Sequence, residues 1–78
     1  MQTIELDCAP GAVRPGDLLP GVLAGTGLEP RPASSMLFGN WTFDYSDVDS
    51  KVWEQVKPTI RARIEALYFN GAIRYGSW

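Results

Sequence analysis

Residues 46–71 read SDVDSKVWEQVKPTIRARIEALYFNG, and one apolar stripe runs through them. Its members, at steps of four, four, four and three, are Val52, Val56, Ile60, Ile64 and Leu67. Because an α-helix repeats every ~3.6 residues, such spacing puts these side chains on one face. The stretch therefore predicts a helix of about 20 residues whose apolar face packs on the core.

Polar signals mark both ends of this helix, and a proline lies inside it. Asp47 and Asp49 are N-cap candidates, since carboxylates accept the free amides of a first helical turn. Asn70-Gly71 is a C-terminal signal, because glycine adopts the left-handed conformation at little cost. Pro58 lacks one backbone amide donor. Because the apolar stripe keeps its phase through Pro58, we expect one kinked helix rather than two short ones.

Three segments show the alternation of β-strands. Residues 2–7 alternate apolar and polar side chains, as a half-buried strand does. Residues 36–45 are expected to form one strand, with Trp41 and its alternate neighbours on the buried face. Gly39 within it indicates a bulge or a place where another group approaches the backbone closely. Residues 72–75 alternate again and predict a last strand.

A short helix is expected between the first two strands, over residues 18–24. Asp17 is its predicted N-cap, and Pro20 is acceptable because it falls in the first turn. Gly25 or Gly27 would end the helix in the left-handed conformation.

The prolines of residues 29–35 favour an extended linker after that helix. Together these elements predict the α+β class in the order β-α-β-α-β, as a single small domain over residues 1–78. A small antiparallel sheet would pack against the long C-terminal helix that Pro58 kinks.

The residue types that usually carry catalysis or bind metals are scarce. Histidine is absent, so Ser-His and Cys-His pairs and the commonest metal ligand are missing. Cys8 is the one cysteine, and we expect it to be a small buried hydrophobe. We therefore expect no catalytic residue, no cofactor and no metal site, and the chain is not expected to be an enzyme.

The same composition bears on the compartment. One cysteine cannot form an internal disulfide, which fits a reducing cytosol better than secretion. The first seven residues lack the basic and apolar regions of a signal peptide. No apolar run approaches the ~20 residues of a membrane span. We expect a soluble cytoplasmic protein without a membrane partner.

Charge is divided unevenly along the chain. Residues 1–50 hold seven acids and two bases, and residues 51–78 hold five bases and two acids. This asymmetry indicates either a polar binding face or charges neutralised within the fold. Bases near aromatic rings can bind single-stranded nucleic acid, but the isoelectric point of about 4.8 argues against it.

Aromatic residues exceed what a small core needs. All nine lie between Phe38 and Trp78, and tryptophan, tyrosine and arginine dominate interface hot spots. The predicted partner-binding residues, chosen because the apolar stripe leaves them at its edge or outside it, are Trp53, Tyr68, Trp78, Asp47 and Arg61.

In its size, its acidity and its lack of catalytic residues, the chain resembles small phage-encoded inhibitors of host systems, such as anti-CRISPR proteins. The resemblance rests on composition and on no motif. It implies a non-enzymatic protein-binding module, an inhibitor or adaptor that docks on a larger protein. Two alternatives remain: a structural subunit of a larger assembly such as a phage particle, and a nucleic-acid-binding accessory factor using residues 51–78. A folded monomer or a homodimer would fit the inhibitor, whereas disorder or open-ended assembly would fit the structural subunit.

Overall fold

The computed structural model describes residues 2–9, 11, 13–37 and 39–78. Its elements, in chain order, are β1 (Thr3–Asp7), α1 (Pro15–Leu23), β2 (Ser35–Leu37), β3 (Asn40–Asp44), α2 (Ser50–Phe69) and β4 (Tyr75–Ser77). Neither helix in this described part of the chain is long and apolar enough to cross a membrane.

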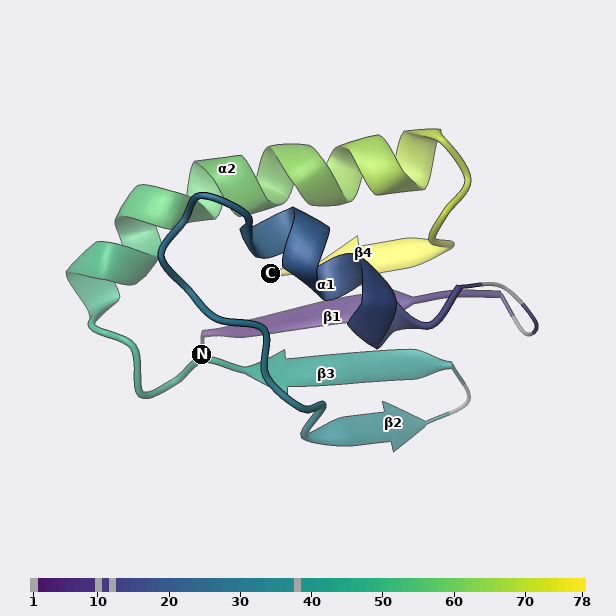
Figure 1. Cartoon of the computed structure of the whole chain (residues 1–78), viewed down its shortest axis with the longest axis horizontal. Helices are drawn as coiled ribbons and strands as arrows, with labels where there is room; N and C mark the ends of the chain where they lie inside the picture. Colours follow the sequence, from purple (N-terminus) through teal and green to yellow (C-terminus); the bar gives the residue numbers. More distant parts are fainter. Residues whose placement is uncertain (1, 10, 12, 38) are drawn as a thin grey trace.

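The four strands form one antiparallel sheet in the order β2-β3-β1-β4. Figure 1 shows β1 and β3 at its centre, with α2 running above it. The α+β class is confirmed, but the element order is β-α-β-β-α-β and not β-α-β-α-β. This order and this pairing are those of the split β-α-β, or ferredoxin-like, topology.

The added strand comes from residues 36–45, which form a hairpin and not the single strand we predicted. The chain reverses between Leu37 and Asn40, and Gly39 there has φ of +84°. A β carbon on Gly39 would lie 2.9 Å from the carbonyl oxygen of Cys8, so the expected close approach is confirmed. Phe38 falls outside the described residues. Each of the two strands alternates with the same period of two, so the alternation does not mark the turn between them.

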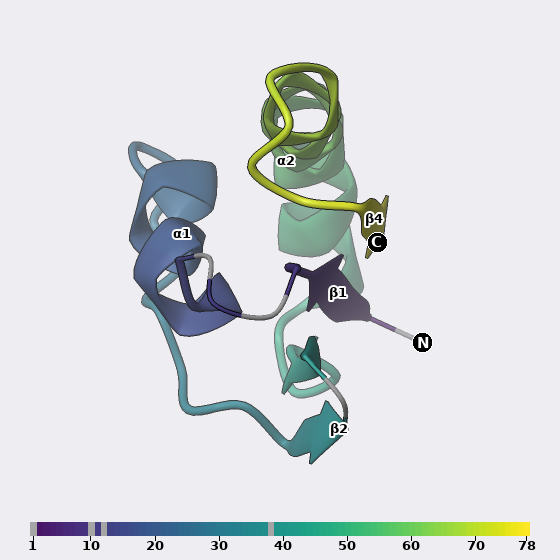
Figure 2. The same ribbon diagram turned by 90° about the vertical axis from the view of Figure 1, so that its right-hand side faces the viewer.

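The core lies between the sheet and the two helices. In β1, Ile4 and Leu6 are fully buried, while alternate residues are partly exposed, so the predicted strand and its buried face are confirmed. Figure 2 shows α1 and α2 on one side of the sheet, with the other face uncovered. The buried residues are Ile4, Leu6, Cys8, Leu19, Val22, Leu23, Phe43, Tyr45, Trp53, Ile60, Ile64 and Ile73.

Helix α2 has the length and the ends that its sequence predicts. Its 20 residues continue through Pro58, which confirms one helix, and Figure 1 shows its first turns tilted against the rest. The Asp49 carboxylate accepts a hydrogen bond from the Lys51 amide at 2.8 Å. Asn70 is the C-cap, and Gly71 follows with φ of +83°.

Helix α1 begins earlier than predicted, at Pro15 after Arg14, and ends at Leu23. Asp17 therefore lies in the first turn and is not the N-cap, and Pro20 lies inside the helix rather than in its first turn. The reason is that the fixed φ of proline suits the first helical position, where no amide partner is needed. Gly25, with φ of +77°, follows the helix end as expected.

The last strand is also displaced, since β4 covers Tyr75–Ser77 instead of residues 72–75. Ile73 is buried, and the Arg74 amide donates a hydrogen bond to the carbonyl of Asp7 at 2.7 Å. Residues 72–74 thus connect α2 to the sheet and contribute to the core before pairing begins.

Candidate functional site

The five predicted partner-binding residues do not form one surface. Trp53 is buried and stacks on Tyr45, with ring centroids 6.1 Å apart, so the prediction that it lies exposed at the edge of the stripe is wrong. Asp47 precedes α2, whereas Tyr68 lies at the other end of that 20-residue helix, about 30 Å long. Of the five, the structure brings together Arg61 and Trp78.

Asp47 is held by an arginine from the segment between α1 and β2. The Arg31 guanidinium donates to both Asp47 oxygens, at 2.5 and 3.3 Å, and to the carbonyl of Asp44 at 3.0 Å. Its Cζ also lies 4.6 Å from the ring centroid of Tyr45. The hydrogen bond from Arg31 lowers the pKa of the Asp47 carboxyl below its ordinary value. Asp47 therefore ties a loop to the fold.

Arg61 and Trp78 meet on one flank of α2. The Arg61 guanidinium carbon lies 5.6 Å from the Trp78 ring centroid, and its Nε donates to Glu65 at 3.1 Å. Together with Glu54, Lys57 and Pro58, this pair lines a hollow of about 180 Å³. The hollow carries both signs of charge and is small.

Part of the basic segment is engaged within the fold, and two of its bases form ion pairs. Arg61 pairs with Glu65, and Arg74 pairs with Asp7 at 2.9 Å. Arg63 donates to main-chain carbonyls of α1. Three of the five bases in residues 51–78 are thus engaged inside the molecule.

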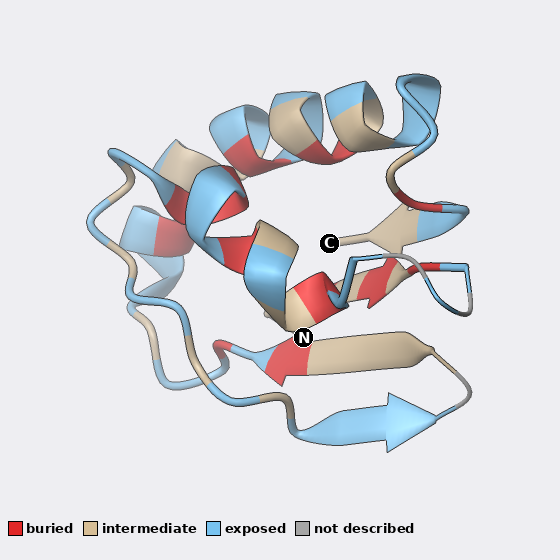
Figure 3. Cartoon of the chain, turned by 45° about the vertical axis from the view of Figure 1, so that its right-hand side comes forward, coloured by how far each residue is buried: buried red, intermediate tan, exposed pale blue. Residues whose placement is uncertain are grey.

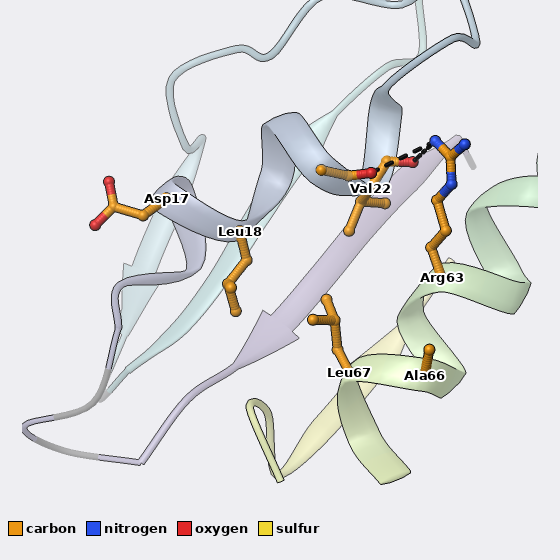
Figure 4. Close-up of a pocket in the computed structure, with 7 residues that line it drawn as sticks. Asp17, Leu18, Val22, Arg63, Ala66 and Leu67 are labelled. Carbon is orange, nitrogen blue, oxygen red and sulfur yellow. Dashed lines mark hydrogen bonds between the residues drawn. The ribbon is translucent and has the colours of Figure 1, made fainter. Parts of the chain in front are cut away.

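A larger apolar recess lies between the two helices. This α1–α2 groove has a volume of about 370 Å³, and its lining residues are Asp17, Leu18, Gly21, Val22, Arg63, Ala66 and Leu67. In Figure 4, Leu18 and Val22 extend from α1 toward α2, and Leu67 extends back toward them. Leu18 and Leu67 pack partly against the core. The groove can bury an apolar group.

Arg63 closes one end of the α1–α2 groove. Its Nη1 donates to the carbonyls of Gly21 at 3.4 Å, Val22 at 3.2 Å and Ala24 (Figure 4 shows the side chain reaching the end of α1). The last carbonyls of a helix lack intrahelical partners, and a cation there is favourable. Arg63 thereby fixes α1 against α2 and holds the walls of the groove in place.

Two exposed aromatic side chains follow the groove residues Ala66 and Leu67 at the C-terminal end of α2. Phe69 follows Ala66 by three positions and so shares its face of α2. Its side chain is 81% exposed, more than any other large apolar residue described. Tyr68 packs edge-on against it, with ring centroids 5.6 Å apart. Phe69 thus adds exposed apolar surface within one helical turn of the groove residue Ala66.

Sequence reasoning missed this surface. Leu18 and Val22 fell within the short helix expected over residues 18–24, and Leu67 belonged to the apolar stripe. Phe69 was one of the nine aromatic residues, with no role assigned to it. A signal did exist: Phe69 lies off the apolar stripe, although a large apolar residue usually favours burial. Gly21 is a second signal in the sequence, because a glycine within a helix leaves space beside its backbone.

The ionisable groups elsewhere are not gathered into a chemical centre. Cys8 is buried, and burial, then the charge of Asp7, raises the pKa of its thiol. Within the described ranges, no three histidine, cysteine, aspartate or glutamate residues come close enough together to hold a metal ion. No protein-family model, curated protein or solved structure matches this chain.

Proposed function

We propose that this chain is a non-enzymatic protein-binding module, a small inhibitor or adaptor, that docks on a larger protein through the α1–α2 groove and Phe69. The observations that support it are an apolar recess and, within one helical turn of its lining residue Ala66, a phenylalanine side chain that is 81% exposed. Exposed apolar surface next to a recess is typical of a protein contact site.

The surface has the parts of an interface hot spot. Burying a side chain such as Phe69 contributes about 1.5–3 kcal/mol. The recess can accept an apolar side chain of the partner, and Asp17 and Arg63 supply charged groups in its lining. Anchors of this kind carry most of the affinity in protein interfaces.

The alternative of nucleic-acid binding finds less support. A four-stranded sheet that binds RNA presents aromatic rings on its open face. Here Trp41 and Phe43 lie opposite Leu6 and Ile4 in the ladder, and so face the helices. Among the described strand residues, Tyr75 of β4, opposite Asp7, is the one aromatic residue on the open face. The outward residues of β1 and β3 are Thr3, Glu5, Asp7, Asn40, Thr42 and Asp44, which are acidic or neutral.

Affinity capture with matched variants tests the proposal. Gly21→Leu adds a side chain to the wall of the groove, at a position where a β carbon has no atom within 4 Å. Phe69→Ala removes the exposed ring. Gln55→Leu is the control: it adds the same leucine to an exposed helical position, 11 residues before Ala66, or about 16 Å along the axis. Circular dichroism first establishes that each variant folds.

We expect one dominant protein from host extract to be retained by wild type and Gln55→Leu and lost with Gly21→Leu and Phe69→Ala. With that protein purified, each groove variant should weaken binding by about tenfold or more. Equal binding by all four proteins would contradict the groove as the site. Tight binding of labelled oligonucleotides, with no captured protein, would favour the nucleic-acid alternative.

A further inference from the structure

β2 is an edge strand that nothing in the described chain covers. It pairs with β3 on one side only, and all three of its residues are exposed (Figure 3). Met36 and Leu37 are 60% and 64% exposed. Natural edges usually carry charges, prolines or covering elements, because free main-chain groups there can pair with another strand. Ser35, Met36 and Leu37 include no charge and no proline.

The opposite edge of the sheet is better protected. Helix α2 packs against β4. Arg74 immediately before it forms an ion pair with Asp7 at 2.9 Å. The two edges therefore differ, and β2 is the one open to another strand.

The side-chain rows of the sheet show what kind of strand fits. Met36 lies opposite Trp41, and Trp41 lies opposite Leu6, so the three share the helix-facing side. This apolar row runs from the buried Leu6 to the exposed Met36, and stops at the edge. A strand with an apolar residue at the matching position would continue it.

We infer that β2 pairs antiparallel with β2 of a second copy of this chain, joining two sheets about a two-fold axis at Met36. Such pairing puts Met36 opposite its own counterpart and Ser35 opposite Leu37. The apolar row then becomes continuous across both molecules. A two-fold contact brings residues near the axis close to their own copies, so any charge there would meet a like charge. The uncharged sequence of β2 avoids this.

The acids of the sheet do not oppose the pairing. The nearest on the outer face is Asp44 of β3. Two β3 strands in the joined sheet are three strand spacings apart, about 14 Å. That separation exceeds the Debye length of about 8 Å at physiological salt, so their repulsion is largely screened.

The contact between the two β2 strands is small, and its small area limits the affinity of the dimer. Three paired residues on each side bury less than the ~1,200 Å² of a standard stable interface. We therefore expect a reversible dimer with a dissociation constant on the order of 0.1 mM. It would use a surface separate from the α1–α2 groove.

Sedimentation equilibrium from about 10 µM to 1 mM spans that constant and tests the inference. Met36→Lys and Leu37→Lys place a charge beside the axis on opposite faces of the sheet. Both positions are exposed, so both variants should fold. Tyr75→Lys is the matched control, because Tyr75 is 53% exposed on the other edge strand. Amide chemical shifts over the same concentrations locate the contact.

We expect wild type and Tyr75→Lys to dimerise alike, each β2 variant to dimerise at least about tenfold more weakly, and concentration-dependent shifts to centre on Ser35–Leu37. A wild-type chain that stays monomeric at the highest concentration would overturn the inference. So would a dimer that Tyr75→Lys weakens and Met36→Lys does not. Shifts at β2 that appear only with an added extended peptide would assign the edge to a foreign strand instead.

Discussion

Gly76 of β4 and Ile64 of α2 touch so closely that a β carbon on Gly76 would overlap Cγ2 of Ile64. The same carbon would lie 3.1 Å from Cδ1 of Ile73. The Ile64 side chain therefore packs directly on the backbone of β4 at Gly76. Ile64 and Ile73 are both buried, so neither can move aside without disturbing the core.

Gly76→Ala should lower the free energy of unfolding by about 1–3 kcal/mol, the cost of overpacking a core. Urea melts followed by circular dichroism measure it. Gly21→Ala is the control, because its β carbon meets open space and alanine favours a helix by up to ~1 kcal/mol over glycine. Equal stability of Gly76→Ala and wild type would show that β4 and α2 are less tightly packed.

Ile64→Ala should cost about 2–5 kcal/mol, because it removes a buried side chain and leaves a cavity. Val52→Ala, at the exposed start of α2, should change the free energy of unfolding by less than ~0.5 kcal/mol. Urea denaturation of both variants compares a buried residue of the predicted stripe with the exposed residue at its start. Similar losses of unfolding free energy in both variants would show that the face of α2 assigned to the core is the wrong one.

Pro58→Ala should keep the fold and preserve or raise helicity. The substitution restores a backbone amide and removes the clash of the proline ring with the preceding turn. Far-ultraviolet circular dichroism and thermal melting measure the change. A marked loss of helical signal would mean that the bend at Pro58 is needed to seat α2 on the sheet.

Arg31→Ala should raise the pKa of Asp47 toward its ordinary value, since Arg31 donates the hydrogen bonds that lower it. A lowered carboxyl pKa stabilises the fold above the unfolded value of about 4, and that contribution is lost as pH falls through the folded pKa. Carboxyl carbon titration by NMR measures the shift. Asp44 is an internal control, because Ser46 is the main cause of its lowered pKa.

Cys8 should react slowly with thiol reagents in the folded protein. Its side chain is buried, and burial raises the pKa of the thiol, so little thiolate is available. At pH 8 we expect labelling at least about tenfold slower than in denaturing urea. Equal rates would mean that the β1–α1 connection opens readily.

Local patterns in the sequence predicted much of the fold. The apolar stripe that includes Ile60 and Ile64 predicted α2, and Asp49 and Asn70-Gly71 predicted its ends. These signals could be read from the sequence because helical periodicity and capping act within a few residues. The alternation in β1 also predicted its buried face. At the N-terminal end of α2, the assumption of strict steps of four assigned Val52 to the buried face, although Val52 is exposed. Each step turns the helix ~400°, so Val52 lies about 80° from Ile60, whereas Trp53 lies about 20° away and enters the core.

What the sequence by itself determined was therefore the α+β class, the long helix and the buried faces near its middle and in β1. The tertiary structure decided where the chain turns between Leu37 and Asn40, because alternation is the same on both sides of a turn. It also decided the candidate site. The α1–α2 groove joins residues more than 40 positions apart, and only the packing of α1 on α2, fixed by Arg63, brings them together.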